Sequence, residues 1–279
     1  MEARARPRRL LLPQPRLRAS DILHRDGRWY LSLTVAVASP ERTRQADGAL
    51  AYDWGVERFL SGVTHTGELE NIDNPRWWQQ EREQTIRLQQ AVSRKANRRS
   101  NRRKKAVRRL AAARAKVARK RLDWAHQQTA ALAGQYALVA TEELTLKNMT
   151  RSAVGTVEEP GKQVTQKAGL NREILDTAPG LFTSLFRYKV LETGGEWVDA
   201  PTRKLKPSQR CPQCWHVAKK QLSQRMHCCE QCGHQENRDT ASARVVLRWA
   251  LESISGQELA ETGIHSPRET PSFAAHRVE

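Results

Sequence analysis

The chain has 279 residues, which is enough for one large domain or two small ones with a buried core. Its formal net charge is +18 at pH 7 and its pI is about 10.3. This balance favours a polyanionic partner, most often nucleic acid, over a basic protein that merely stays soluble. No apolar run approaches the ~20 residues of a transmembrane helix, which argues against a membrane protein.

The first elements in chain order are a leader and a group of strands. Residues 1–27 are rich in arginine, and their only apolar run, "LLLP", is too short for a signal peptide. We therefore expect a disordered basic leader. Alternating apolar residues in "RWYLSLTVAVAS" predict a strand. The stretch "GALAYDWGVERFLSGVTHTGELENI" predicts two strands joined through Gly55 to Glu57, with "HTGE" as the next turn and a buried central strand carrying Ala51 and Trp54.

Residues 75–134 predict a pair of basic helices. Pro75 suits a helix start, and neither Pro nor Gly follows before Gly134. We expect a break near "ANRRSNRR". Sixteen Lys or Arg and no acid lie between Gln84 and Leu122. A solvated helical face is the usual meaning of such a run, but so many cations repel one another unless phosphate lies against them, so we favour nucleic-acid contact. The candidate residues are Arg94, Lys95, Arg98, Arg99, Arg102, Arg103, Lys104, Lys105, Arg108 and Arg109.

Two tryptophans at the start of this region, Trp77 and Trp78, allow two interpretations. They could stack on bases. We favour packing of the helix start against the sheet.

The second half of the chain predicts further strands and helices. "YALVATEEL" is a buried strand, residues 150–170 are a loop, "PGLFTSLFRYKVLETGG" is a helix and "EWVDAP" is a short strand. A last helix runs from about Asp239 to Leu251, and the tail from residue 253 to 279 is expected to be disordered.

All five cysteines lie between Cys211 and Cys232. Such a cluster indicates a metal in a reducing, intracellular compartment rather than disulfides. Two C-x-x-C pairs separated by fourteen residues are typical of a structural four-cysteine zinc site. The predicted ligands are Cys211, Cys214, Cys229 and Cys232. Cys228 is the spare and could replace Cys229, and His216, His227 and His234 could also ligate, although exposed loop positions are favoured for them.

Three acids occupy unusual positions. Asp53 lies in the apolar strand "ALAYDWG", Glu142 ends "YALVATEEL", and Asp239 begins a helix. A carboxylate in an apolar strand is disfavoured unless it is paired or binds a cation. The three together predict a shared Mg²⁺ site, which in two-cation form supports phosphodiester cleavage.

These blocks resemble the transposon-encoded TnpB (OrfB) endonucleases, relatives of the type V CRISPR effectors, from about Arg28 to about Leu251. The blocks are "AYDWGVERF", "VATEELTLKNM", "QKAGLNREILDTAPGLF", "FRYKVLETGGEWVDAP" and the knuckles "SQRCPQCW" and "CCEQCGHQENRDTASA". The resemblance implies an α/β fold with an RNase H-like RuvC nuclease core, and a catalytic triad of Asp53, Glu142 and Asp239. It also implies a DNA target and a guide RNA. Asn237, Ala241 and Trp215 depart from the family pattern, which usually has aspartate, asparagine and glycine there.

The resemblance also implies a division of the chain. Residues 28–47 are expected to be a remnant of an N-terminal wedge-like region that is longer in the family. Residues 48–206 form the nuclease core with the basic insertion 75–134, residues 207–236 the zinc ribbon, and residues 237–252 the last nuclease segment. The predicted function is a transposon-associated, RNA-guided, Mg²⁺-dependent DNA endonuclease. The alternatives are a zinc-ribbon protein that only binds nucleic acid, including an inactive relative, and a DNA-strand transposase.

Overall fold

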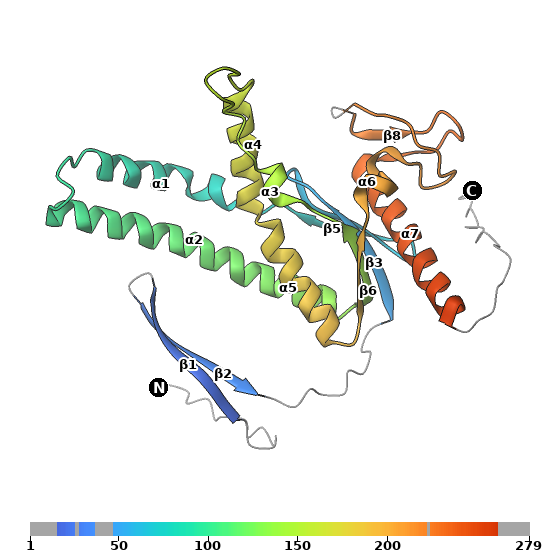
Figure 1. The fold of residues 1–279 in the computed structure, drawn as a ribbon, viewed down its shortest axis with the longest axis horizontal. Coiled ribbons are helices and arrows are strands. Elements are labelled where there is room, and N and C mark those ends of the chain that lie inside the picture. The colour runs from blue at the N-terminus through green and yellow to red at the C-terminus, as the bar shows by residue number, and fades with distance from the viewer. Residues whose placement is uncertain (1–15, 26–27, 37–46, 222–223, 262–279) are drawn as a thin grey trace. The chain divides into compact units, whose positions relative to one another are not determined.

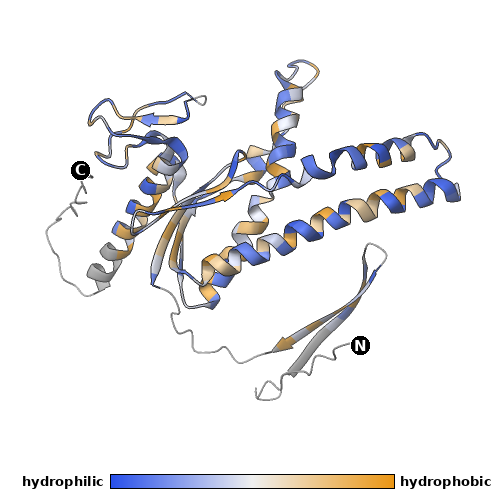
Figure 2. Ribbon diagram, turned by 180° about the vertical axis from the view of Figure 1, so that it is seen from behind, coloured by the Kyte–Doolittle hydropathy of each residue, from blue (hydrophilic) through white to orange (hydrophobic). Residues whose placement is uncertain are grey.

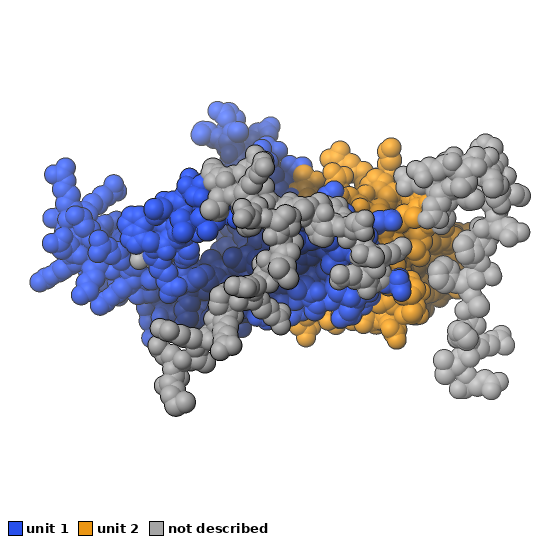
Figure 3. All heavy atoms as spheres, turned by 90° about the horizontal axis from the view of Figure 1, so that it is seen from below, with its two compact units in different colours: residues 1–47, 74–137, 146–196 blue, residues 48–73, 138–145, 197–279 orange. Residues whose placement is uncertain are grey.

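The computed structural model describes residues 16–25, 28–36, 47–221 and 224–261 (Figure 1). Its strands and helices divide between two compact units, one of residues 1–47, 74–137 and 146–196 and one of residues 48–73, 138–145 and 197–279 (Figure 3). The expected core of residues 48–206 is therefore split, because residues 146–196 group with the helical insertion. The mixed α/β class predicted from the sequence is confirmed.

A five-stranded sheet organises the second unit. Its order is β5-β4-β3-β6-β7. Strands β3 to β5 form an antiparallel meander, with Asp53 opposite Ser61 in the β3–β4 pair. The two strands expected here, joined through Gly55 to Glu57, are β3 and β4, and β3 is central and largely buried as expected. The bounds are β3 Gly48–Trp54, β4 Arg58–Thr64, β5 Leu69–Asp73, β6 Tyr136–Glu142 and β7 Glu196–Ala200.

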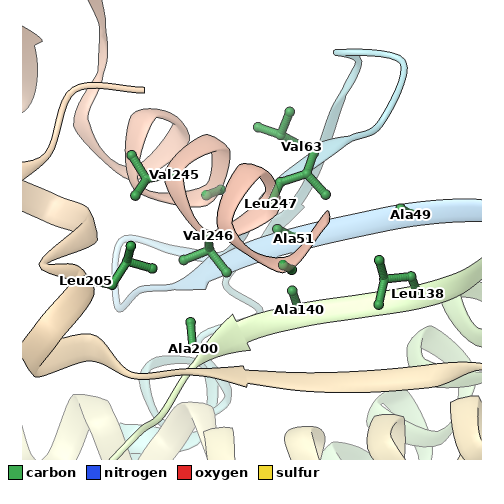
Figure 4. Close-up of a cluster of buried hydrophobic side chains, with 12 residues drawn as sticks. Ala49, Ala51, Val63, Leu138, Ala140, Ala200, Leu205, Val245, Val246 and Leu247 are labelled. Atoms are coloured by element: carbon green, nitrogen blue, oxygen red, sulfur yellow. The ribbon is translucent and has the colours of Figure 1, made fainter. Parts of the chain in front are cut away.

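Helix α7, Arg238–Glu261, packs against β3 and β4 of this sheet. Its buried side chains Val245, Val246 and Leu247 lie over small residues of the strands, including Ala51 and Ala140 (Figure 4). Small strand residues let the helix backbone approach the sheet closely, and the burial of the valines and leucine stabilises that approach by about 1.5–3 kcal/mol per side chain. This packing fixes the start of α7 beside the ends of β3 and β6.

Between β7 and α7 lie short elements and the cysteine-rich segment. They are α6 Thr202–Leu205, a 3-10 turn at Pro207–Gln209, and the small antiparallel pair β8 Met226–Cys228 and β9 Gln235–Asn237. The chain passes directly from β9 into α7, so the cysteine-rich segment is joined without a linker to the helix that carries Asp239.

The helical unit is built around a long helix pair. Helices α1, Trp77–Ser93, and α2, Asn101–Ala133, are the two helices expected over residues 75–134, and their break falls at residues 94–100. Both are mainly hydrophilic, with scattered apolar positions (Figure 2). Helix α2 also packs against α5, Pro179–Glu192, and this unit includes α3, Leu146–Met149, and α4, Val164–Thr177.

Aromatic side chains link these helices. The ring of Trp77 lies 6.5 Å from Trp124 of α2, whose ring is 6.0 Å from Phe182 of α5. The ring contact of Trp77 is thus with another helix, whereas packing of the helix start against the sheet was expected. Asp176 is buried and accepts from the backbone N–H of Trp78 (2.7 Å) and from Arg121 (2.6 Å), which joins α1, α2 and α4.

Three other expectations need correction. Arg16–Arg25 forms strand β1, paired with β2, Arg28–Ala36, so these leader residues are not disordered. The expected loop 150–170 already contains the first turns of α4 from Val164. Helix α7 continues to Glu261, well into the expected tail.

The remaining leader residues 1–15 and tail residues 262–279 lie outside the described part of the chain. Among the described helices, none is both long and apolar enough to cross a membrane.

Candidate functional site

Asp53 lies on β3, next to the strand end at Trp54. It is half-buried in a strand whose preceding residues, Leu50 to Tyr52, are almost fully buried. The strand is apolar because α7 covers its face, and this leaves the carboxylate of Asp53 in a poorly solvated position. Such a position is costly for a charge unless cations or hydrogen-bond donors compensate it.

Glu142 ends β6, the strand next to β3 in the sheet. Its carboxylate is half-buried and its Oε1 accepts a hydrogen bond of 2.8 Å from the hydroxyl of Ser242. Glu143, the next residue, is exposed, and its backbone N–H donates to the carbonyl of Ala200. Glu143 thus lies just beyond the strand and is exposed, whereas Glu142 is half-buried.

Asp239 lies in the first turn of α7. The side-chain Oδ1 of Asn237 accepts from the backbone N–H of Asp239 (3.0 Å) and of Thr240 (3.4 Å), so Asn237 acts as the N-cap. An acid in a first helical turn is stabilised by the helix dipole. Asn237 therefore keeps the helix start well defined although it departs from the aspartate usual in the family.

The carboxylate of Asp53 is affected electrostatically by the other two acids. Burial raises the pKa of Asp53 well above its ordinary value, and the negative charges of Glu142 and Asp239 raise it further. Burial also raises the pKa of Glu142, against the hydrogen bonds from Ser242 and Thr202. Asp53 therefore lies within electrostatic reach of both other acids, although the three carboxylates are not among the metal-ligating groups that lie within 4.8 Å of one another in the described residues. Acids close enough to repel one another are a setting that divalent cations neutralise.

Arg238 adds a positive charge to the same place. Its charge lowers the pKa of both Asp53 and Glu142. Its guanidinium also donates to the backbone carbonyl of Gln221 (3.2 Å) in the cysteine-rich segment. Arg238 thus connects that segment to the acidic site, a role for which the sequence carried no signal beyond its position next to Asp239.

The second candidate site is the group of four cysteines predicted as zinc ligands. The Sγ atoms of Cys211, Cys214, Cys229 and Cys232 all lie within 4.8 Å of one another. Across the two C-x-x-C pairs, Cys211 is 3.6 Å from Cys232 and Cys214 is 3.5 Å from Cys229. Of the described residues, these four form the one set of three or more metal-ligating side chains this compact. The set could hold a metal ion.

Each C-x-x-C pair folds into the same turn. In the first, Trp215 N–H donates to Cys211 O and Cys211 N–H to His216 O; in the second, Gly233 N–H donates to Cys229 O and Cys229 N–H to His234 O. Burial raises the pKa of Cys211 to about 12, while backbone N–H groups of Cys214 and Gln213 act in the opposite direction. A bound cation would favour the thiolate form, and the thiolate is the metal ligand.

The spare ligands stay outside this cluster. Cys228 is exposed and does not belong to it. His216 is exposed as expected, whereas the expectation of an exposed loop position is wrong for His227. His227 is 2% exposed, lies in β8 and contacts Lys220, and its ring is 5.9 Å from that of His234. Burial lowers the pKa of His227 to about 4.

The basic residues divide into two groups. Arg103 is half-buried and donates from one guanidinium nitrogen to the carbonyls of Val92 and Lys95, which closes the α1–α2 turn. Lys95 donates to Ala91 O at the end of α1. Arg103 and Lys95, two of the residues predicted to contact nucleic acid, thus already make hydrogen bonds within the protein. The others are exposed, namely Arg94, Arg98, Arg99, Arg102, Lys104, Lys105, Arg108 and Arg109.

Two family profiles match this chain. Residues 32–153 match OrfB_IS605, described as "Probable transposase", and residues 180–246 match the Cas12f1-like TNB domain. A relative from Escherichia coli (strain K12), "Putative RNA-guided DNA endonuclease InsQ", is 31% identical over 240 residues, which cover 85% of this chain and 58% of that protein. The chain belongs to the TnpB (OrfB) family.

A second TnpB-type relative, "Putative RNA-guided DNA endonuclease" from Streptomyces pristinaespiralis, is 29% identical over 258 residues and covers 90% of this chain. The chain spans 58% of the length of each of these two relatives. The first profile contains Asp53 and Glu142 and the second contains the four clustered cysteines and Asp239. The family assignment thus covers both candidate sites.

Solved structures give the same fold for this TnpB family member. A CRISPR-Cas12f ternary complex has a TM-score of 0.52 at 16% identity, and a Cas12f1–sgRNA–target DNA complex has 0.54 at 17%. Each match covers 78% of this chain and 42% of the other. At such identities the likeness concerns the fold alone.

Proposed function

We propose that this chain carries the nuclease centre of a transposon-associated, RNA-guided DNA endonuclease. The five-stranded sheet with α7 would be its RNase H-like RuvC core, residues 207–236 its zinc ribbon, and residues 28–47 part of a wedge-like region. The observation that carries the proposal is the coupling of Asp53, Glu142 and Asp239 at the ends of β3 and β6 and the start of α7. All three carboxylates are partly buried and Asp53 is repelled by the other two, a setting that suits a divalent cation.

The donor set fits magnesium. Mg²⁺ prefers a few carboxylates together with water and substrate phosphate oxygens, and these three residues offer carboxylates only. When bound, Mg²⁺ would activate water and neutralise the charge that develops on the phosphate. The protein's own contribution is to hold the acids at the ends of two adjacent strands, with Asn237 fixing the helix start under Asp239.

The four cysteines fit zinc rather than magnesium, because thiolates are soft ligands and a tetrahedral four-sulfur set leaves no open position for water. We propose that this ion is structural. A segment with two three-residue strands buries little apolar surface, so metal binding would supply much of its folding free energy.

The positive charge of the exposed basic residues at the α1–α2 turn and on α2 supports a nucleic-acid partner. The exposed cations from Arg94 to Arg109 suit a phosphate backbone, which positions nucleic acid without specifying its sequence. Since the relatives are named RNA-guided DNA endonucleases, a guide RNA and a DNA target are the partners that we propose.

The deciding experiment uses the full chain. It is purified from cells without chelators, its bound RNA is sequenced, and cleavage of a DNA target matching that RNA is tested with Mg²⁺. We expect cleavage by the parent and by Glu143→Gln, and none by Asp53→Asn or Glu142→Gln, with nucleic-acid binding unchanged. Binding without cleavage by the parent would favour the binding-protein alternative. Strand joining in place of hydrolysis would favour the transposase alternative.

A further inference from the structure

A buried hydroxyl group contacts the acidic site from α7. Ser242 is 0% exposed, and its Oγ donates to Oε1 of Glu142 at 2.8 Å. The two residues are 100 positions apart in the sequence, so this bond joins the helix to the end of β6. It forms on the same turn of α7 that carries Asp239.

The geometry of the helix explains why one turn can serve two acids. Ser242 follows Asp239 by three residues, and residues three apart lie on the same face of a helix. Asp239 therefore presents its carboxylate on the side of α7 where Ser242 reaches Glu142. Ala241, which precedes Ser242 in the sequence, is buried and has no polar side-chain atom.

The bond made by Ser242 differs from the ordinary bond of a helical serine. Such a hydroxyl usually donates to the carbonyl four residues earlier in its own helix. Ser253 of α7 shows this arrangement, since its Oγ donates to Trp249 O at 2.8 Å. Ser242 instead donates to the carboxylate of Glu142, which belongs to strand β6 and not to α7.

We infer that Ser242 is a positioning residue for Glu142, which orients the Glu142 carboxylate for divalent cation binding. This inference rests on the proposed function. An ionised carboxylate has about four acceptor sites, so one hydrogen bond at Oε1 fixes its plane and leaves other sites for a cation. The hydroxyl of Thr202 in α6 donates to the backbone carbonyl of the neighbouring Glu143 (3.5 Å) and also lowers the pKa of Glu142. The hydrogen bond from Ser242 is therefore the contact that we expect to orient the Glu142 carboxylate before any cation arrives.

Hydrogen-bonded partners of metal ligands commonly alter metal affinity by about 10- to 100-fold when they are removed. A purely structural serine would behave differently. Its removal would lower stability equally with and without the cation, because the cation would bind a carboxylate that needs no help in orientation.

The test measures cation binding rather than cleavage. The full-length parent, Ser242→Ala, Ser242→Thr and Ser253→Ala are compared, with Mn²⁺ replacing Mg²⁺ so that free ion is counted by electron paramagnetic resonance. Asp53→Asn serves as the blank for Mn²⁺ bound elsewhere. Zinc content and melting temperature in buffer freed of divalent cations by chelating resin show that each variant is folded.

We expect Ser242→Ala to weaken Mn²⁺ binding by about 10-fold or more, with unchanged zinc content and a smaller rise in melting temperature on Mn²⁺ addition. Ser242→Thr, which keeps the hydroxyl, should recover most of the affinity, and Ser253→Ala should match the parent. If the parent binds Mn²⁺ through Asp53 and Ser242→Ala binds it equally well, the role of Ser242 is disproved while the proposed function stands. If the parent binds no more Mn²⁺ than Asp53→Asn, the proposed cation site itself fails, and the role of Ser242 with it.

Discussion

Trp215 and Gly233 occupy equivalent positions in the two cysteine turns, one residue after the second cysteine of each pair, and both have positive φ, 66° and 75°. Glycine adopts this conformation freely, whereas a side chain at left-handed φ costs roughly 1–2 kcal/mol. Trp215 is partly buried against the core and lies between the guanidinium groups of Arg210 (5.1 Å) and Arg248 (4.5 Å). These contacts offset its backbone strain.

This balance predicts an order of stability at position 215. Trp215→Gly loses the apolar packing and two cation–π contacts of about 0.5–1 kcal/mol each, but it relieves the strain. Trp215→Ala loses the same contacts and keeps the strain, so it should be less stable than the glycine variant by about 1 kcal/mol. Thermal unfolding of the zinc-loaded proteins checks this order. An alanine variant at least as stable as the glycine variant would show that the backbone at 215 is not strained.

The cysteine cluster predicts one tightly bound zinc per chain. Cys211→Ser should lose the ion and unfold the segment from Cys211 to Asn237, because thiolate coordination supplies its folding free energy. The matched control is Cys228→Ser, since Cys228 is exposed and outside the cluster. Elemental analysis of protein purified without chelator measures the number of zinc ions per chain. Zinc retained by Cys211→Ser, or absent from the parent, contradicts the ligand set.

The raised pKa of Asp53 predicts a pH-dependent stability. A carboxyl group whose folded pKa lies above its unfolded value of about 3.9 stabilises the fold when protonated, and this contribution is lost as the pH rises through the folded value. In buffer without free divalent cations, Asp53→Asn should therefore gain stability relative to the parent as the pH rises from the unfolded value of about 3.9 towards the folded value. A gain of 1 kcal/mol corresponds to roughly 2–4 °C in Tm.

The same comparison has an internal check. Mg²⁺ should raise the Tm of the parent more than that of Asp53→Asn, because the cation neutralises the repulsion that the substitution removes. Resin-treated buffer is needed in place of EDTA, which would also strip the cysteine cluster. If the difference in Tm between the parent and Asp53→Asn stayed constant across this pH range, the ionisation of Asp53 would not oppose folding, and the raised pKa would be contradicted.

The exposed arginines at the α1–α2 turn predict a salt-dependent contact. Replacing Arg98, Arg99 and Arg102 by glutamine should weaken duplex binding regardless of sequence and reduce the slope of log affinity against log salt by up to about 2.7. Arg103→Gln is the matched control. Its guanidinium already donates within the turn, so it should lower stability and leave the slope nearly unchanged. Equal slopes for the triple variant and the parent would place these arginines away from phosphate.

Much of the sheet could be predicted because its strands have a clear local signal. Apolar alternation marked β2, and the continuously buried strands β3, β4 and β6 appeared as largely apolar runs. Asp53 and Glu142 were found because a carboxylate contradicts such a run. Their unusual positions, together with that of Asp239, suggested a shared divalent site, whereas their role as a catalytic triad came from the family resemblance, since sequence periodicity does not show which strand ends meet.

The supporting residues were missed for a physical reason. Ser242 is a small polar residue in a helix, and its partner is fixed by tertiary packing. A signal did exist, since Ser242, Val246 and Ala250 repeat every four residues on the buried stripe of α7, where a polar residue is unusual. Strand β1 was missed because the arginines at Arg16, Arg18 and Arg25 made residues 16–25 resemble the basic leader before them.

The basic part of α2 sets a length scale. From Arg102 to Arg121 the helix rises by roughly 30 Å at 1.5 Å per residue, which approaches the 34–36 Å of one turn of duplex DNA. If its exposed cations bind a duplex as proposed, the helix would contact phosphates along most of one turn without distinguishing the bases. Discrimination between targets would then have to come from base pairing with another nucleic-acid strand or from other parts of the protein.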